Sequence, residues 1–136
     1  ADLRRAISDA YYAMFHRLCE ALVEHMNAQD PSETAFKQTF ETLYRLPDHK
    51  LVTEKCKQAH KFGFSKEVVS FANGLAKFKL KREQADYNPL EKFAISEVRT
   101  DIETVETHMK KFDGLNPVER SRFAYFVCLK VSRGKG

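Results

Sequence analysis

Apolar residues recur at steps of three and four positions along almost the whole chain, which is the spacing of one face of an α-helix. No segment of useful length alternates between apolar and polar residues, as a half-buried strand would. We therefore predict an all-α protein, with helices at about residues 2–28, 31–46, 48–60, 65–88, 95–113 and 117–131.

Capping and stop residues divide the apolar pattern into these segments. Short connections between helices favour antiparallel neighbours, so we expect one domain over residues 1–136, built as an antiparallel bundle of about four longer and two shorter helices. Residues 131–136 are expected to form a flexible tail. The signals are N-caps at Asp30, Asp48, Ser65 and Asn116 and stops at Pro89 and Gly114.

The composition is typical of a folded domain that carries a mildly basic surface. Hydrophobic residues make up 43% of the 136 residues, which is enough for a core, and the net charge is +4. Basic residues are concentrated at 77–82 and 120–135. Such a surface could meet nucleic acid or an acidic protein, but a solvated helix face is the simpler interpretation.

Three cysteines, Cys19, Cys56 and Cys128, are widely spaced and lie among apolar residues. An odd number without a Cys-x-x-Cys pair argues against a disulfide framework and against a zinc knuckle. No apolar segment approaches membrane-spanning length, and no signal-peptide pattern is present. We therefore expect a cytoplasmic protein without membrane contact.

The helix predicted at 65–88 breaks its own apolar pattern at Arg82. Its stripe continues by one more turn onto this arginine, and a charge on a core-facing stripe needs a partner or a water-filled cleft. Asp86 follows at the spacing of a same-face pair. Arg82 and Asp86 therefore form either an ion pair that fixes the helix end or part of a functional site. The stripe consists of Val68, Phe71, Leu75 and Phe78.

A second group of polar residues lies along one edge of the first predicted helix. Arg5, Asp9, Tyr12 and His16 follow one another at steps of four and three residues. Together they could bind phosphate or move a proton. The simpler alternative is a solvated edge with an Arg5–Asp9 pair and a half-buried Tyr12.

Two segments resemble signatures of the HEPN-like proteins. Residues 82–88, Arg-Glu-Gln-Ala-Asp-Tyr-Asn, are similar to the family's Arg-x-x-Ala-Asp-Tyr-Asp/Asn pattern. Residues 5–16, Arg-Ala-Ile-Ser-Asp-Ala-Tyr-Tyr-Ala-Met-Phe-His, are similar to its Arg-x-x-Ser-x-x-Tyr-Tyr-Ala-x-Phe-His opening. The order of elements also agrees, so the resemblance covers nearly the whole chain.

The resemblance implies an antiparallel helical bundle that often forms a homodimer. Many relatives are metal-independent endoribonucleases, frequently the toxin of a toxin–antitoxin pair whose antitoxin is nucleotidyltransferase-like. Their active site uses an Arg and a His separated by four to six residues. The Arg stabilises charge on the phosphate, while a base takes the proton of a ribose 2′-hydroxyl.

This chain departs from the family pattern at the histidine. The positions after Arg82 where the family has His hold Tyr87, Asn88 and Pro89. A tyrosine hydroxyl ordinarily titrates near pH 10 and a histidine near pH 6.5, so a tyrosine is no direct replacement for the base. Arg45 and His49 are one residue too close together and do not count as the motif.

We therefore expect a HEPN-like binding module that acts as a homodimer, without cofactor or metal. Its ligand would be RNA, a nucleotide or a partner protein such as a nucleotidyltransferase-like antitoxin. The alternative is a metal-independent endoribonuclease of toxin–antitoxin type, in which Arg82 acts with a nonstandard base, Tyr87 or His16. The residues expected to bind are Arg5, Asp9, Tyr12, Arg82, Asp86 and Tyr87.

Overall fold

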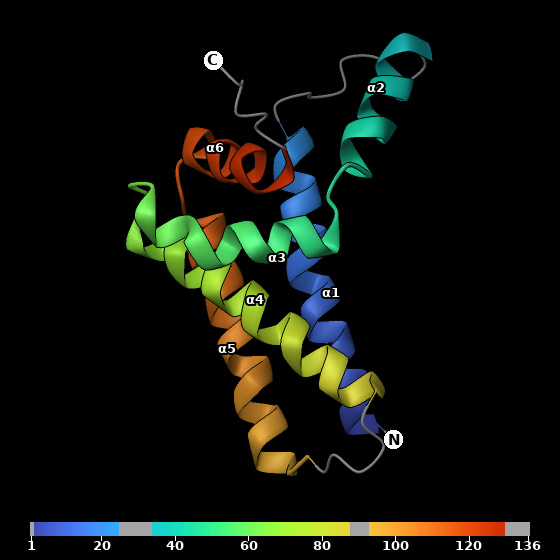
Figure 1. Ribbon diagram of the computed structural model, residues 1–136, viewed down its shortest axis with the longest axis vertical. Helices are drawn as coiled ribbons and strands as arrows, with labels where there is room; N and C mark the ends of the chain where they lie inside the picture. The colour runs from blue at the N-terminus through green and yellow to red at the C-terminus, as the bar shows by residue number, and fades with distance from the viewer. Residues whose placement is uncertain (1, 25–33, 88–92, 130–136) are drawn as a thin grey trace, which may run out of the picture.

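The computed structural model describes residues 2–24, 34–87 and 93–129, and within these ranges the protein is all-α without a strand (Figure 1). Three helices have 19 to 22 residues and three have 10 to 12, where the sequence predicted four longer and two shorter ones. The helices are α1 (Asp2–Val23), α2 (Thr34–Tyr44), α3 (His49–Gln58), α4 (Lys66–Tyr87), α5 (Ile95–Asp113) and α6 (Pro117–Cys128).

The three long helices, α1, α4 and α5, pack against one another, and the shorter ones cover them. Helix α3 packs on α4, and α6 packs on both α1 and α3, so α3 and α6 cover one end of the core (Figure 1). Helix α2 packs against α1 at the same end of the molecule (Figure 1). At the opposite end, the last turn of α4 lies beside the first turn of α1.

The predicted stripe of α4 forms the centre of the core. Its four members are buried, and Phe71 stacks on Phe112 of α5 with 4.2 Å between ring centres. In α5 the sequence predicts an apolar stripe of Ile95, Val98, Ile102, Val105, Met109 and Phe112; Val98, Val105 and Phe112 are buried, but Ile95 is 61% exposed. Ile95 is the first residue of its helix and is mostly exposed, so the periodic pattern overestimates its burial.

Local capping explains where several helices begin. The Asp48 carboxylate accepts hydrogen bonds from the backbone N–H groups of Lys50 and Leu51, and the Ser65 hydroxyl accepts one from Val68. Gly63 has a φ of 78°, a backbone conformation that favours glycine, and it breaks the chain between α3 and α4. The predicted caps at these positions are therefore confirmed.

The end of α5 is only partly as expected. Gly114 is the C-cap residue, as predicted, but its φ of −78° is not the left-handed conformation that usually selects glycine there. The predicted signals at Asp30 and Pro89, the helix end at residue 28 and the tail at 131–136 lie outside the described residues.

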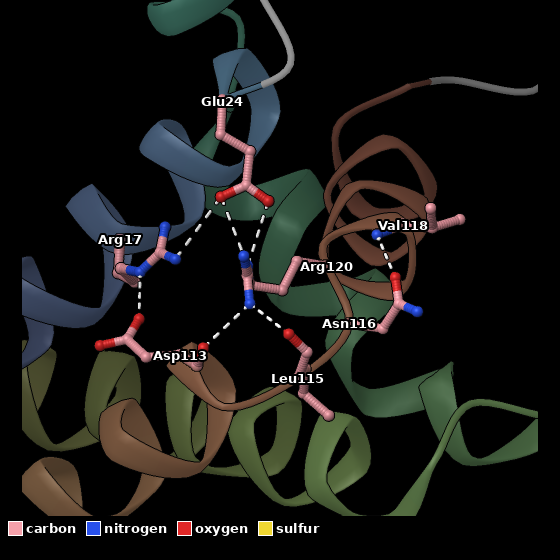
Figure 2. A network of polar contacts seen from close by, with 7 residues as sticks. All are labelled: Arg17, Glu24, Asp113, Leu115, Asn116, Val118 and Arg120. Carbon is pink, nitrogen blue, oxygen red and sulfur yellow. Dashed lines mark hydrogen bonds and ion pairs between the residues drawn. The ribbon is translucent and has the colours of Figure 1, made fainter.

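A network of ion pairs joins α1 to the connection between α5 and α6 (Figure 2). The Arg120 Nε donates to both carboxylate oxygens of Glu24, at 3.1 and 3.3 Å, and its Nη1 donates to the carbonyls of Asp113 and Leu115. Arg17 of α1 lies 3.6 Å from Glu24 and donates to the Asp113 carboxylate at 2.5 Å. One guanidinium thus satisfies carbonyls at the end of α5 while it holds the end of α1 in place.

Replacing Arg120 should destabilise the protein, because Glu24 and the two carbonyls would lose their donor. The Arg120 side chain is only 12% exposed, so we expect Arg120→Ala to lower the free energy of unfolding by about 2–3 kcal/mol in urea denaturation. Arg122→Ala, two positions along the same helix and exposed, should change it by less than about 0.5 kcal/mol. Equal effects of the two substitutions would contradict a structural role for the network.

Candidate functional site

Arg82 lies where the buried stripe of α4 reaches the surface. Its side chain is 24% exposed, and its Cζ atom lies 4.9 Å from the centre of the Tyr12 ring and 5.9 Å from that of Tyr11. The Nε atom is 3.4 Å from the Asp86 carboxylate but makes no hydrogen bond to any described residue. The expected Arg82–Asp86 ion pair therefore forms, and the guanidinium is held mainly against aromatic faces.

His49 joins the same group from α3. As the first residue of that helix it follows the Asp48 cap, and its ring stacks on Phe15 at 3.9 Å between centres. Its Nδ1 lies 2.6 Å from the Tyr11 hydroxyl, and its ring meets the Tyr12 ring edge-on at 6.1 Å. We call these side chains the Arg82–His49 cluster: Tyr11, Tyr12, Phe15, His49 and Arg82.

The protonation states in the cluster follow from burial and charge. Burial raises the pKa of Tyr11 well above its usual range, so its hydroxyl keeps its proton and needs an acceptor. Burial, with added repulsion from Arg82, Lys79 and His16, lowers the pKa of His49 below 6.5 against a weaker opposing effect of Asp48. A neutral His49 can accept a hydrogen bond from the Tyr11 hydroxyl at Nδ1, which leaves the imidazole's own proton on Nε2.

Two further contacts hold the end of α4 and hence the position of Arg82. Arg4 of α1 donates a hydrogen bond to the carbonyl of Ala85, in the last turn of α4, where carbonyls lack partners within the helix. Lys81 forms an ion pair at 2.6 Å with Asp101, a buried carboxylate of α5. Arg82 is thus positioned by a helix end that both neighbours anchor.

The predicted edge of α1 is only partly associated with this cluster. Tyr12 belongs to it, and His16 lies on the exposed side of Tyr12 with 6.5 Å between the ring centres. Arg5 and Asp9 are exposed, and within the described residues no ion pair joins them, so the Arg5–Asp9 pair of the simpler interpretation does not form.

Tyr87 lies apart from the other predicted site residues. It is the last described residue of α4, and its side chain is 78% exposed. It is five residues beyond Arg82, which on a helix turns it away from the face that Arg82 shares with Asp86.

The histidine of the cluster, His49, is not among the candidates selected from the sequence. Along the chain His49 is near Arg45, at a spacing that does not fit the family motif, whereas the structure brings it to Tyr11, 38 residues away, and near enough to Arg82 for that charge to lower its pKa. The Asp48 cap predicts that His49 begins a helix. Residues close to it in the sequence do not predict which other helix the beginning of this helix packs against.

The cysteines are unsuited to nucleophilic chemistry. All three are buried, and burial raises the pKa of the Cys19 thiol to about 11 and that of Cys128 to about 12. The pKa of Cys56 is raised for the same reason. Their thiols therefore stay protonated, and they act as small apolar residues of the core.

The described residues offer neither a metal site nor a membrane span. Among them, no group of three or more His, Cys, Asp or Glu side chains is placed to hold a metal ion. None of their helices combines the length and the apolar character needed to cross a membrane. Comparison of the chain with models of protein families, with curated proteins and with solved structures finds no match.

Acidification should destabilise the protein through two histidines. Burial lowers the pKa of His49 and also that of His108, which Lys111 and Lys77 lower further. The unfolded chain then binds more protons, so the free energy of unfolding should fall between about pH 7.5 and pH 5.5. Urea denaturation at the two pH values measures this loss.

The double substitution His49→Gln and His108→Gln serves as the control for the pH effect. The double variant should lose less free energy of unfolding between pH 7.5 and pH 5.5 than the unsubstituted protein, whatever its stability at pH 7.5. A pH dependence that is unchanged in the double variant would mean that other groups cause it.

Proposed function

We propose that this chain is a HEPN-like binding module that holds a phosphate group of RNA at the Arg82–His49 cluster and acts as a homodimer. The observation that carries this proposal is the place of Arg82, a cation against the Tyr12 ring whose side chain is 24% exposed, so that a ligand can reach it. Its ion pair with Asp86 is long, at 3.4 Å, so an anionic ligand would add the closer hydrogen bonds that a guanidinium can donate.

The chemistry of the cluster suits a phosphate. A guanidinium offers its donors in a fork that can bind two phosphate oxygens at once, and the aromatic rings beside it exclude water. A neutral His49 with its proton on Nε2 supplies a further donor. Hydrogen bonds of this kind are stronger where the surroundings are of low dielectric.

The same protonation states favour binding over cleavage. A base that removes the 2′-hydroxyl proton needs a free lone pair, and that of His49 is occupied by the Tyr11 hydroxyl at 2.6 Å. Tyr11 itself stays protonated because burial raises its pKa. The cluster therefore has donors for an anion and no free base among its buried members.

One observation favours a second candidate, a metal-independent endoribonuclease of toxin–antitoxin type. The imidazoles of His16 and His49 flank the Tyr12 ring, at 6.5 and 6.1 Å between ring centres, next to Arg82. His16 is exposed and could supply the base that this chain lacks at the position of the family's histidine. Tyr87 is less suited to this role, because it points away from Arg82.

RNA binding that depends on Arg82 tests the main proposal. Arg82→Ala should weaken binding of a fluorescently labelled single-stranded RNA by at least about tenfold in an anisotropy titration, because it removes charge-assisted hydrogen bonds to phosphate. It should also lower the slope of log affinity against log salt concentration by about one. Arg99→Ala, an exposed arginine of α5, is the matched control and should leave the affinity within about twofold.

The same titration, run with a chelator present, separates the two candidates. RNA that is bound but intact agrees with a binding module. Equal affinities for the Arg82→Ala and Arg99→Ala proteins would overturn the proposed site. Cleavage that Arg82→Ala and His16→Ala both abolish would replace the binding proposal with the nuclease.

An apolar stripe on α6 supports the homodimer. Val118 and Tyr125 are exposed large apolar residues two turns apart on α6, and the exposed Leu129 directly follows the helix. Phe62, which is 57% exposed, lines a pocket together with Val118. A second copy of the chain would cover this stripe, with its own stripe in a two-fold arrangement.

The solution molar mass tests the dimer. We expect twice the mass of one chain by light scattering, and we expect Tyr125→Lys to shift the protein toward the monomer because it puts a charge into the contact. Glu103→Lys, at an exposed position of α5, should leave the mass unchanged. A monomer at high protein concentration would contradict the proposal.

A further inference from the structure

A groove of about 410 Å³ lies between α3 and α4 and has basic rims. Lys50 and Lys57 line it from α3, and Lys77 and Lys79 line it from α4. In Figure 1 the two helices diverge from the turn that joins them, with the beginning of α3 pointing toward α1. The groove therefore opens toward the part of the molecule that holds His49.

The groove lies next to the Arg82–His49 cluster. Lys79 lines it and also lies close enough to His49 to lower the pKa of that imidazole. Thr53, another lining residue, donates a hydrogen bond at 2.7 Å to the carbonyl of His49. On both helices a lining residue directly follows a residue of the cluster: Lys50 follows His49, and Glu83 follows Arg82.

The charges of the groove favour an anion. Its four lysines outnumber its two glutamates, and one of these glutamates, Glu83, forms an ion pair with Lys79. Lys50, Lys57 and Lys77 are exposed and form no ion pair with any described residue. Glu54 offsets part of their charge and leaves the rims positive.

The floor of the groove differs from its rims. Ala76 and Leu80 of α4 line it, and Leu80 is 56% exposed, which is unusual for a large apolar side chain on a helix between two basic rows. A single nucleic acid strand presents phosphates and flat apolar base faces side by side, because its bases are not paired. Cationic rims and an apolar floor match these two features.

We propose that this groove binds the nucleotides of a single-stranded RNA that flank the phosphate held by Arg82, with the lysines on the phosphates and the apolar floor against a base or ribose. This inference rests on the proposed function and specifies its ligand. A strand of several nucleotides would occupy both the cluster and the groove. A free mononucleotide or dinucleotide would occupy only the cluster.

A length series of RNA tests the groove separately from the cluster. The double variant Lys57→Ala and Lys77→Ala should weaken binding of a strand of about eight nucleotides roughly tenfold and reduce its salt dependence, yet leave binding of a dinucleotide unchanged. The control is Lys110→Ala with Lys111→Ala, an equal loss of charge at exposed positions of α5, which should affect neither ligand. Circular dichroism of each variant verifies that it is folded.

The outcomes decide whether the groove binds RNA. Equal effects of the two double variants on the longer strand would mean that only net charge matters, and would overturn the inference. A loss of both ligands in Arg82→Ala, with no effect of the lysine variants, would keep the proposed function and reject the groove. An acidic peptide of about eight residues that displaces the longer RNA at lower concentration than RNA itself would assign the groove to a protein partner instead.

Discussion

The contact between the Arg82 guanidinium and the Tyr12 ring marks the point where the core of this protein ends and its candidate site begins. Helix α4 repeats buried residues up to Phe78, and the next position on that face is a cation instead of another apolar side chain. A charge there is tolerated because aromatic faces, Asp86 and partial exposure compensate for the water it has lost. The remaining features of the site follow from accommodating this one charge.

The second constraint is the buried hydroxyl of Tyr11. It is inaccessible to water, so it needs a hydrogen-bond acceptor, and the acceptor is an imidazole that the beginning of α3 supplies. Satisfying this hydroxyl fixes both the orientation of His49 and the nitrogen that carries its proton. Because α1, α3 and α4 all contribute to the core, the donors are held in position before any ligand arrives, which reduces the entropy lost on binding.

The features that could be predicted from the sequence are those that depend on residues close together along the chain. The helical class, the buried stripe of α4, the caps at Asp48 and Asn116 and the pairing of Arg82 with Asp86 all follow from local spacing. The exposure of Ile95 and the role of His49 do not, because both depend on which elements meet in space. The HEPN resemblance rests on two motifs and stays a prediction, as does the homodimer.

The two sequence motifs contribute differently to the structure. The first helix contributes mainly core residues, but Tyr11 and Tyr12 face the arginine of the second motif, so the two segments meet at one place. The family pattern places a histidine after the arginine along the chain. In this protein an imidazole reaches the same neighbourhood from another helix, with its lone pair already engaged.

The most direct test of this account is an NMR pH titration of the His49 imidazole, with and without a saturating short single-stranded RNA. In the free protein the pKa of His49 should lie below its ordinary value near 6.5. A phosphate bound between Arg82 and His49 would stabilise the protonated ring, so RNA should raise that pKa. A pKa of His49 that saturating RNA leaves unchanged would show that the nucleic acid binds elsewhere and would contradict the central claim.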